Sequence, residues 1–405
     1  MKLAHPSVAT LASLAGLMIG AACSCDRKPT PTPQPVPTPQ PAPAQAAPSP
    51  SGGSAAESEP VKQPTHDERL GKPDLVAENA DADLKSSKVV GLLETPHLAG
   101  TSLVWCSTMQ LAWNAMEVGL GEPVEVTPAG AASGYQSAAA STDDLDSGSY
   151  VALGGFGRDG ILDAIKTQLK DKFGGAASPS MLPAVIPPDD LFAYAYLFKA
   201  LEFAEPFARL PEGMRFGSAP VGGFGLWPSG LIENRSKIAS QIDVRHYASP
   251  EDWTVQLTTK DAADMLVVAR REPGATLAET VAAIVASMKP GDAPLRFLNE
   301  DTLRVPLMNF DVTRNYGELV GLTVVGTKGG GTIAMAKQNI RLRLDEKGAI
   351  LKSEAAIGVT SAMPQPVTPK VMVCDGPFML LLMRKDAPQP YFAAWIESPE
   401  LLVKR

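Results

Sequence analysis

Apolar positions recur at helical spacing in the first half of the chain's candidate folded region. A helix is predicted over residues 107–119, STMQLAWNAMEVG, where Ser107 is a possible cap and one stripe carries Met109, Ala112, Trp113 and Met116. A second amphipathic helix is predicted over 160–173, GILDAIKTQLKDKF, by the same spacing. The small-residue stretch between them, 127–149, is predicted to be loop.

The second half of the chain instead carries short apolar or alternating runs bounded by Gly, Pro and Asp. A capped helix over 276–288 interrupts them. Helices first and strands afterwards predict an α+β protein with antiparallel or mixed sheets. The predicted strands are 191–203, 247–259, 263–271, 302–316, 339–344, 376–384 and 390–398.

The N-terminal region indicates export. Residues 1–22 are typical of a signal peptide, and Gly-Ala-Ala-Cys at 20–23 is similar to a bacterial lipobox, in which Cys23 is lipidated. An ordinary cleaved signal is the alternative. Residues 23–81 are dominated by Pro-rich, weakly apolar sequence that predicts a disordered tether, which leaves 82–405 as the folded domain. We therefore expect an outer-membrane or cell-surface lipoprotein attached to the membrane through its lipid anchor.

Charge and composition exclude several function classes. The 405 residues have a net charge of -8 and 20% charged residues, which does not favour a basic surface for nucleic acid. Of four histidines, two lie outside the predicted fold, so no metal site built from His is expected. The body keeps Cys106 and Cys374, which form either a disulfide or two separate buried thiols.

No motif in the body predicts catalysis. Gly155, Gly157 and Gly160 match a dinucleotide-binding spacing, but no ribose-binding acidic residue follows at the required distance, so a flexible entry to a helix is favoured. There is no nucleophile elbow, and the paired acids at 143–144 and 189–190 fit helix caps or solvated faces. The chain is therefore predicted not to be an enzyme, and no catalytic residue is assigned.

Residues 344–370 combine a strand-compatible segment with one that no sheet interior can hold. A polar turn is predicted over 345–348, where Gly348 can adopt a positive φ. From Ala349 to Val359 every second residue is uncharged, while the charges lie on the opposite row. Three prolines then remove ladder donors at Pro364, Pro366 and Pro369. Residues 349–359 can therefore join a sheet, but the proline-containing segment that follows them must stay outside it.

The stretch LDEKGAILKSEAAIGV, followed by a loop and then CDGPFMLLLMRKDAPQPYFAAWIESP, resembles the C-terminal third of a serpin. Residues 192–207 resemble the serpin strand that runs into the breach segment, with Ala200 in place of Gly and Phe203 in place of Trp one residue late. Residues 102–119 resemble the first buried strand and its helix. The resemblance implies a serpin-like fold, with helices packed on a large mixed sheet plus smaller antiparallel sheets.

In that family a serine or cysteine protease cleaves an exposed loop, and the cut loop inserts as an added strand that distorts the protease. The resemblance implies an extracellular or periplasmic protease as partner and no cofactor. It places the cleaved bond near Pro366 and Val367, with Met363 or Lys370 as alternatives. The hinge comprises Ser353, Ala355, Ala356, Ile357 and Gly358.

Two departures keep other functions open. Four extra residues separate Gly348 from Ser353, and Lys352 stands where inhibitory serpins favour Gly. A non-inhibitory serpin-like surface lipoprotein with a binding or structural role is therefore the alternative to an inhibitor, and an unrelated enzyme is a third reading.

Overall fold

The computed structural model describes residues 77–228, 232–261, 263–288, 295–348 and 368–405, which all lie in one compact unit. The signal peptide, Cys23 and nearly all of the Pro-rich tether fall outside these residues, as do the predicted hinge and Met363, Pro366 and Val367. The first described strand, β1, already begins at Ala77, before the expected domain start at residue 82.

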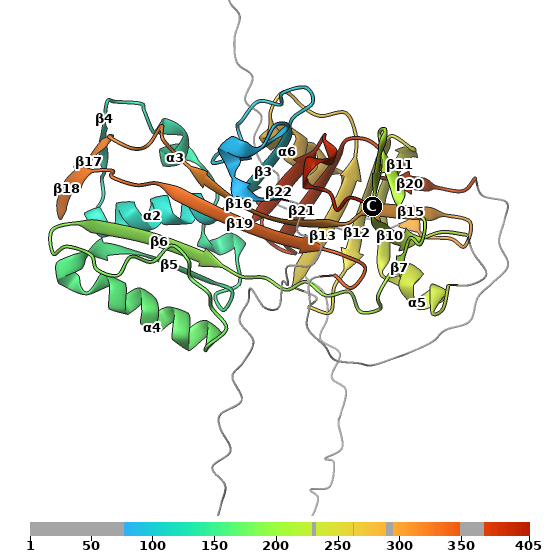
Figure 1. Cartoon of the computed structure of the whole chain (residues 1–405), viewed down its shortest axis with the longest axis horizontal. Helices are drawn as coiled ribbons and strands as arrows, with labels where there is room; N and C mark the ends of the chain where they lie inside the picture. Colours follow the sequence, from blue (N-terminus) through green and yellow to red (C-terminus); the bar gives the residue numbers. More distant parts are fainter. Residues whose placement is uncertain (1–76, 229–231, 262, 289–294, 349–367) are drawn as a thin grey trace, which may run out of the picture. The chain divides into compact units, whose positions relative to one another are not determined.

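The chain has an α+β fold organised around a large mixed sheet of eight strands (Figure 1). In this sheet β2 and β3, at one edge, pair in parallel, and the other described pairings are antiparallel. Its strands, in spatial order, are β14 (Leu295–Arg296), β11 (Ile242–Ser249), β12 (Asp252–Thr258), β13 (Asp264–Arg270), β21 (Phe378–Arg384), β22 (Phe392–Ile396), β3 (Ser102–Cys106) and β2 (Ser87–Val90).

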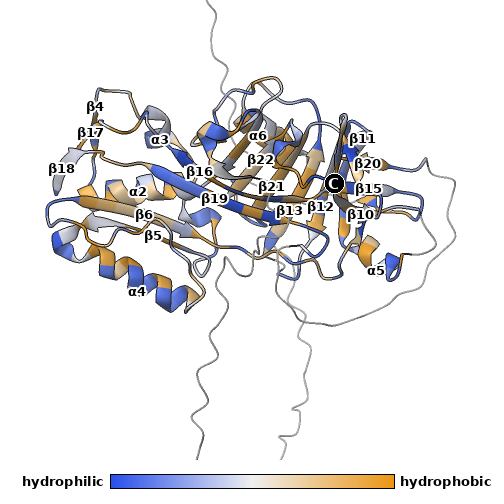
Figure 2. Ribbon diagram, in the orientation of Figure 1, coloured by the Kyte–Doolittle hydropathy of each residue, from blue (hydrophilic) through white to orange (hydrophobic). Residues whose placement is uncertain are grey.

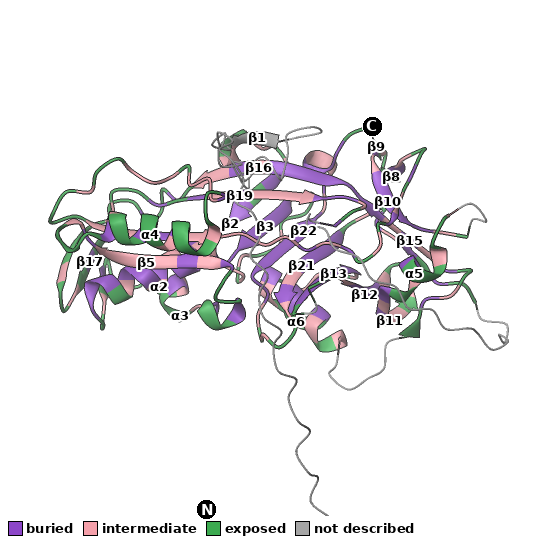
Figure 3. Cartoon of the chain, turned by 90° about the horizontal axis from the view of Figure 1, so that it is seen from below, coloured by how far each residue is buried: buried purple, intermediate pink, exposed green. Residues whose placement is uncertain are grey.

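Both faces of the large sheet are covered, which explains its nearly continuous apolar strands (Figure 2). Helix α6 (Leu277–Ser287) covers one face through Leu277, Val281 and Ile284, which pack with side chains such as Val267 and Met379. The other face packs against a four-stranded sheet and β16. Most residues of β13, β21 and β22 are therefore buried (Figure 3).

The four-stranded sheet has the order β20 (Val371–Val373), β15 (Thr302–Pro306), β10 (Gly223–Leu226) and β7 (Ala208–Arg209). A three-stranded sheet joins β1 (Ala77–Ala80), β16 (Met308–Asn315) and β19 (Lys337–Leu344). A separate antiparallel pair is formed by β5 (Tyr150–Phe156) and β6 (Leu191–Leu197). These last two units supply the candidate site.

The remaining elements are short, apart from two helices that cover the β5–β6 pair. Helix α2 (Thr108–Leu120) contacts both of its strands, and α4 (Ile161–Phe173) packs through Ile161, Ile165 and Leu169 on the side that carries Val151 and Tyr194. The other elements are α3 (Ser133–Ser137), α5 (Arg235–Ser240), β4 (Glu125–Thr127), β17 (Thr323–Gly326), β18 (Gly329–Thr332), β8 (Met214–Phe216) and β9 (Ala219–Val221).

The helical periodicities are confirmed, but several predicted strand limits were wrong. The run 302–316 is two strands of different sheets, because the chain passes from β15 to β16 at Leu307. The run 247–259 turns at 250–251, where Pro250 cannot donate to a ladder. The run 191–203 ends as a strand at Leu197. The predicted loop 127–149 contains α3 and a 3-10 turn over Thr142–Asp144.

Candidate functional site: the β6/β19 junction

Strands β6 and β19 each have one edge that carries no ladder partner among the described residues. Strand β6 pairs only with β5, and β19 pairs only with β16, in the part of the chain that the structure describes. Both strands contact helix α2, which supports them from one side (Figure 1). We call β6 and β19, with the segments 198–207 and 345–348 that follow them, the β6/β19 junction.

The two strands are joined through the segments that follow their C-terminal ends. The backbone N–H of Phe203 donates to Lys347 O at 3.2 Å, and that of Phe207 donates to Glu346 O at 2.8 Å. Glu202 and Gly348 form an isolated bridge. Because each of these segments follows its own strand, β6 and β19 run in the same direction toward this end.

Gly348 stands at the point of closest approach. Its φ is +84°, and a Cβ added there would lie 2.5 Å from Leu201 O and 2.6 Å from Phe203 N. The N–H of Gly348 donates to Asp345 O at 3.1 Å, which closes the turn that the sequence predicts. Glycine is required both by the positive φ and by the approach of the segment after β6.

Aromatic packing and ion pairs hold the joined end. The Phe203 ring lies 4.8 Å from Phe207 and 6.1 Å from Phe224 by centroids, and all three side chains are buried. Lys199 forms a buried ion pair with Asp264, with Nζ and Oδ2 2.6 Å apart. The part of 192–207 that follows β6 is therefore the segment that meets the turn after β19.

A buried glutamine fixes β19 to the start of α2. Gln338 is 2% exposed, and its Nε2 donates to Cys106 O at 2.9 Å and to Thr108 Oγ1 at 2.8 Å. Its Oε1 accepts a 2.5 Å bond from the hydroxyl of Tyr316, whose pKa burial raises. Sequence analysis missed Gln338, although it continues the buried row of Ile340 and Leu344 and is polar.

Two glycines in and just before the 155–160 motif allow close backbone packing. Just before it, Gly154 touches α2, since a Cβ there would lie 2.0 Å from Ala115 O. Gly157 approaches Pro187 O, with 2.1 Å to an added Cβ. Gly155 lies in β5, Gly157 begins a 3-10 turn and Gly160 stands at the N-cap of α4, so the motif does form the entry to a helix. Close backbone packing, which side chains would prevent, explains the glycines at 154 and 157.

Lys370 is the one candidate cleavage residue that the structure describes. Its side chain is buried, and its Nζ lies 2.7 Å from Asp301 Oδ2. The backbone N–H groups of Lys370 and Leu298 also donate to the Asp301 carboxylate, each at 2.7 Å. Lys370 thus fixes the chain immediately before β20. Its ammonium group is paired with Asp301 and is not presented to a protease. Sequence analysis did not identify Asp301.

Among the described residues, the remaining histidine, cysteine and acidic groups do not assemble a catalytic site. His246 pairs with Asp252, with 3.3 Å between Nε2 and Oδ2. Cys106 and Cys374 are both free and buried, so the disulfide alternative is wrong, and burial raises the pKa of each thiol. Asp144 accepts from Ser141 N at 3.0 Å, which confirms its capping role. Among the described residues, no cluster of His, Cys, Asp or Glu is arranged to hold a metal ion.

Comparison with known proteins gives a weak structural likeness. No family model matches the chain, and no curated protein matches it. Among solved structures it is similar to serpin-12 of Manduca sexta (15% identity, TM-score 0.37, covering 61% of this chain and 67% of that one). It is also similar to the thermophilic serpin tengpin in its native state (13%, 0.38, 59% and 63%).

A third similar structure is serpin48 of the insect Tenebrio molitor, at 14% identity and TM-score 0.33. That match covers 59% of this chain and 65% of the serpin, so the chain spans slightly less than two thirds of that relative's length. Within the described residues, no helix is both long and apolar enough to cross a bilayer.

Proposed function

We propose that this protein inhibits a serine or cysteine protease by presenting the segment after Gly348 as a substrate and inserting it, once cut, between β6 and β19. The observation that carries the proposal is that β6 and β19 run in the same direction, that the segments after them are joined, and that among the described residues each strand has one edge without a ladder partner. The likeness between the 344–396 sequence and serpins supplies the reaction.

The direction of the chain fits such an insertion. After the turn at 345–348, a segment that folded back along β19 would run antiparallel to β19 and also to β6. Antiparallel strands hydrogen-bond well on both sides, and each backbone bond contributes about 1 kcal/mol net. The uncharged row from Ala349 to Val359 would then face the layer of α2 without burying a charge.

Both ends of the loop are anchored by described contacts. Gly348 is held against Leu201 and Phe203 on one side, and Lys370 is held by buried Asp301 on the other. A cut between them would release the N-terminal part while the C-terminal part stays with β20. The antiparallel bridge between Glu202 and Gly348 already has the orientation that an inserted segment would continue along β6.

The experiment incubates the purified full chain with elastase-like, trypsin-like and prolyl-specific proteases. An inhibitor gives a covalent complex that survives SDS, and loop-cleaved protein unfolds about 10 °C or more above intact protein, since several new backbone bonds are formed. If every protease cuts the loop without a complex and without a rise in the unfolding temperature, the proposal is wrong. A non-inhibitory binding role would then be favoured.

A matched pair of variants tests the inserted row. Ser353→Arg would place a charge on the inward row and should convert the inhibitor into a substrate, whereas Glu354→Arg, on the outward row, should leave complex formation unchanged. Equal complex yields for the two variants would contradict insertion in this register.

The partner and location are part of the same proposal. An extracellular or periplasmic protease is the target, and lipidation of Cys23 holds the domain on the outer membrane or cell surface. Incorporation of labelled palmitate, lost in Cys23→Ser, tests the anchor independently of inhibition.

A further inference from the structure

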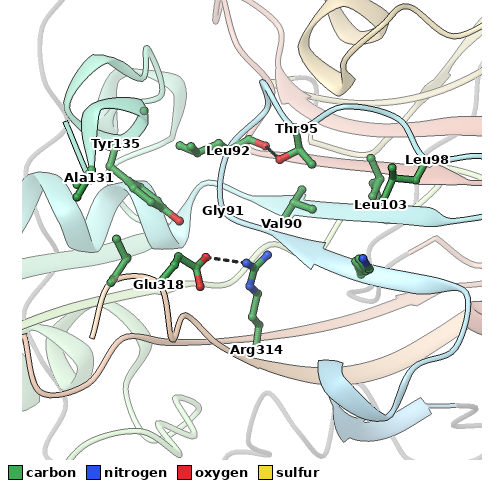
Figure 4. A pocket seen from close by; sticks show the side chains of 14 residues that line it. Val90, Gly91, Leu92, Thr95, Leu98, Leu103, Ala131, Tyr135, Arg314 and Glu318 are labelled. Atoms are coloured by element: carbon green, nitrogen blue, oxygen red, sulfur yellow. Dashed lines mark hydrogen bonds and ion pairs between the residues drawn. The ribbon is translucent and has the colours of Figure 1, made fainter. Parts of the chain in front are cut away.

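A cavity of 340 Å³ lies between the segment after β2, helix α3 and the segment that follows β16 (Figure 4). No residue of the β6/β19 junction lines it. Its wall is largely apolar: Leu103 and Leu319 are buried parts of it, Leu92 is half-buried and Leu98 is exposed. Its volume falls in the range of pockets that hold small organic molecules.

One hydroxyl group is directed into this cavity without a partner. Tyr135 is 6% exposed, and its hydroxyl points into the space beside Glu318 (Figure 4). This hydroxyl forms no hydrogen bond among the described residues, and it is not one of the unbonded polar atoms that are sealed from solvent. A ligand in the cavity can therefore reach it. Gly91 makes room for the hydroxyl, since a Cβ at that residue would lie 2.0 Å from the hydroxyl oxygen.

Glu318 supplies a second acceptor on the same side of the cavity. Its Oε1 accepts from Arg314 Nη2 at 2.7 Å, and no group of the described residues donates to its Oε2. The side chain is 51% exposed, so a ligand can approach the carboxylate. The carboxylate acts on the Tyr135 hydroxyl through its charge and is not hydrogen-bonded to it. The cavity thus offers two acceptors to a donor that enters it.

The charges around the Tyr135 hydroxyl favour a cation. Burial, and after it the charge of Glu318, raises the pKa of Tyr135 to about 12, and the opposing effect of Arg314 is smaller. Tyr135 is therefore a neutral group in a field that Glu318 makes negative. Arg314 is already engaged, because it pairs with Glu318 and donates to Val89 O. Lys88, the other cationic side chain of the described lining, is exposed, so solvent and salt screen its charge.

We infer that this cavity binds a small, apolar primary amine whose ammonium group donates to the Tyr135 hydroxyl and to Glu318 Oε2. The apolar body of the amine packs on Leu92, Leu103 and Leu319. An ammonium group has three donors and no acceptor, which matches two acceptors that lack donors. This site does not depend on the proposed protease inhibition.

The test uses three closely matched probes that differ at their polar end: 3-phenylpropylamine, 3-phenylpropanol and 3-phenylpropionate. Titration calorimetry of the full chain at about pH 7, where an alkylamine is protonated, should rank the amine first and the carboxylate last. The amine should bind about five- to tenfold more tightly than the alcohol, the difference between a charged and a neutral hydrogen bond. An alcohol or carboxylate that binds as tightly as the amine, or no binding of the amine below about 1 mM, would overturn the inference and leave water as the occupant of the polar end.

Tyr135→Phe separates a binding role from a structural one. It removes only the unbonded hydroxyl and keeps the ring that stacks on Trp113 at 5.3 Å between centroids. The unfolding temperature should therefore stay within about 2 °C of that of the wild type, whereas amine binding should weaken about three- to tenfold. A side chain that served packing alone would leave amine binding unchanged.

Three further variants locate the site. Glu318→Gln should remove the preference for the amine over the alcohol, whereas Glu94→Gln, at an exposed carboxylate outside this cavity, makes the same change in net charge and should preserve it. Ala131→Phe, at an exposed residue of the lining, should weaken the amine by about tenfold by obstructing the cavity. Unchanged amine binding in Ala131→Phe, or equal effects of the two Glu→Gln changes, would refute the assignment.

Discussion

The buried pair of Asp301 and Lys370 gives an asymmetric prediction for stability. The Asp301 side chain is fully buried and accepts three bonds, from the Lys370 ammonium, the Lys370 backbone N–H and the Leu298 N–H. Asp301→Ala removes all three and leaves an ammonium group that is only 10% exposed without its partner. Removing one member of a buried pair costs about 3–5 kcal/mol.

Lys370→Met should cost less, because the carboxylate keeps both backbone donors. The methionine retains the apolar stem, and the two backbone donors still stabilise the buried carboxylate, so the cost should lie at the low end, about 3 kcal/mol. Urea unfolding, followed by far-UV circular dichroism, should rank wild type above Lys370→Met and Lys370→Met above Asp301→Ala. Lys385→Met, at an exposed lysine, is the control and should stay within about 0.5 kcal/mol.

A contrary ranking would refute this reasoning. If Lys370→Met were as unstable as Asp301→Ala, the backbone bonds to the carboxylate would contribute nothing. If both variants matched the Lys385→Met control, the pair would not fix the chain before β20. Anchoring of the C-terminal end of the predicted loop would then lose its support.

Three further predictions concern single positions. Gly154→Ala should lower the unfolding temperature strongly, because its Cβ would lie 2.0 Å from Ala115 O, whereas Gly155→Ala meets nothing closer than 3.4 Å and should be tolerated; equal effects would contradict the packing role. Gly348→Ala should cost at least about 1–2 kcal/mol from its positive φ alone, measured by urea unfolding, and a neutral result would exclude the close approach. Burial lowers the pKa of His97, against a raising effect of Glu397, so the folded state binds fewer protons than the unfolded state below the ordinary pKa of 6.5. The stability that this residue contributes is therefore present above pH 6.5 and is lost as the pH falls toward the lowered pKa. Between pH 7 and about pH 5, the unfolding temperature of His97→Asn should fall less than that of the wild type.

Local sequence was sufficient for the helices and for the turn after β19. The apolar stripe of 107–119 predicts α2 within one residue at each end, because a helix satisfies its own backbone and needs only one covered face. Gly348 was predicted to allow a positive φ and has one, since a turn is closed by residues three apart. The alternation of 339–344 likewise predicts which row of β19 is buried.

Only the tertiary structure decided which segments meet. Asp301 and Lys370 are 69 positions apart, and nothing in either local pattern pairs them. The run 302–316 has one continuous apolar pattern, yet its two strands belong to different sheets. A strand that is buried on both faces shows the same apolar pattern in any sheet, so the sequence does not say which sheet it joins. The edges of β6 and β19, which have no ladder partner among the described residues, could not be predicted for a similar reason. Side-chain alternation shows which faces of a strand are buried, whereas the edges of a strand are backbone, and their partners are set by long-range packing.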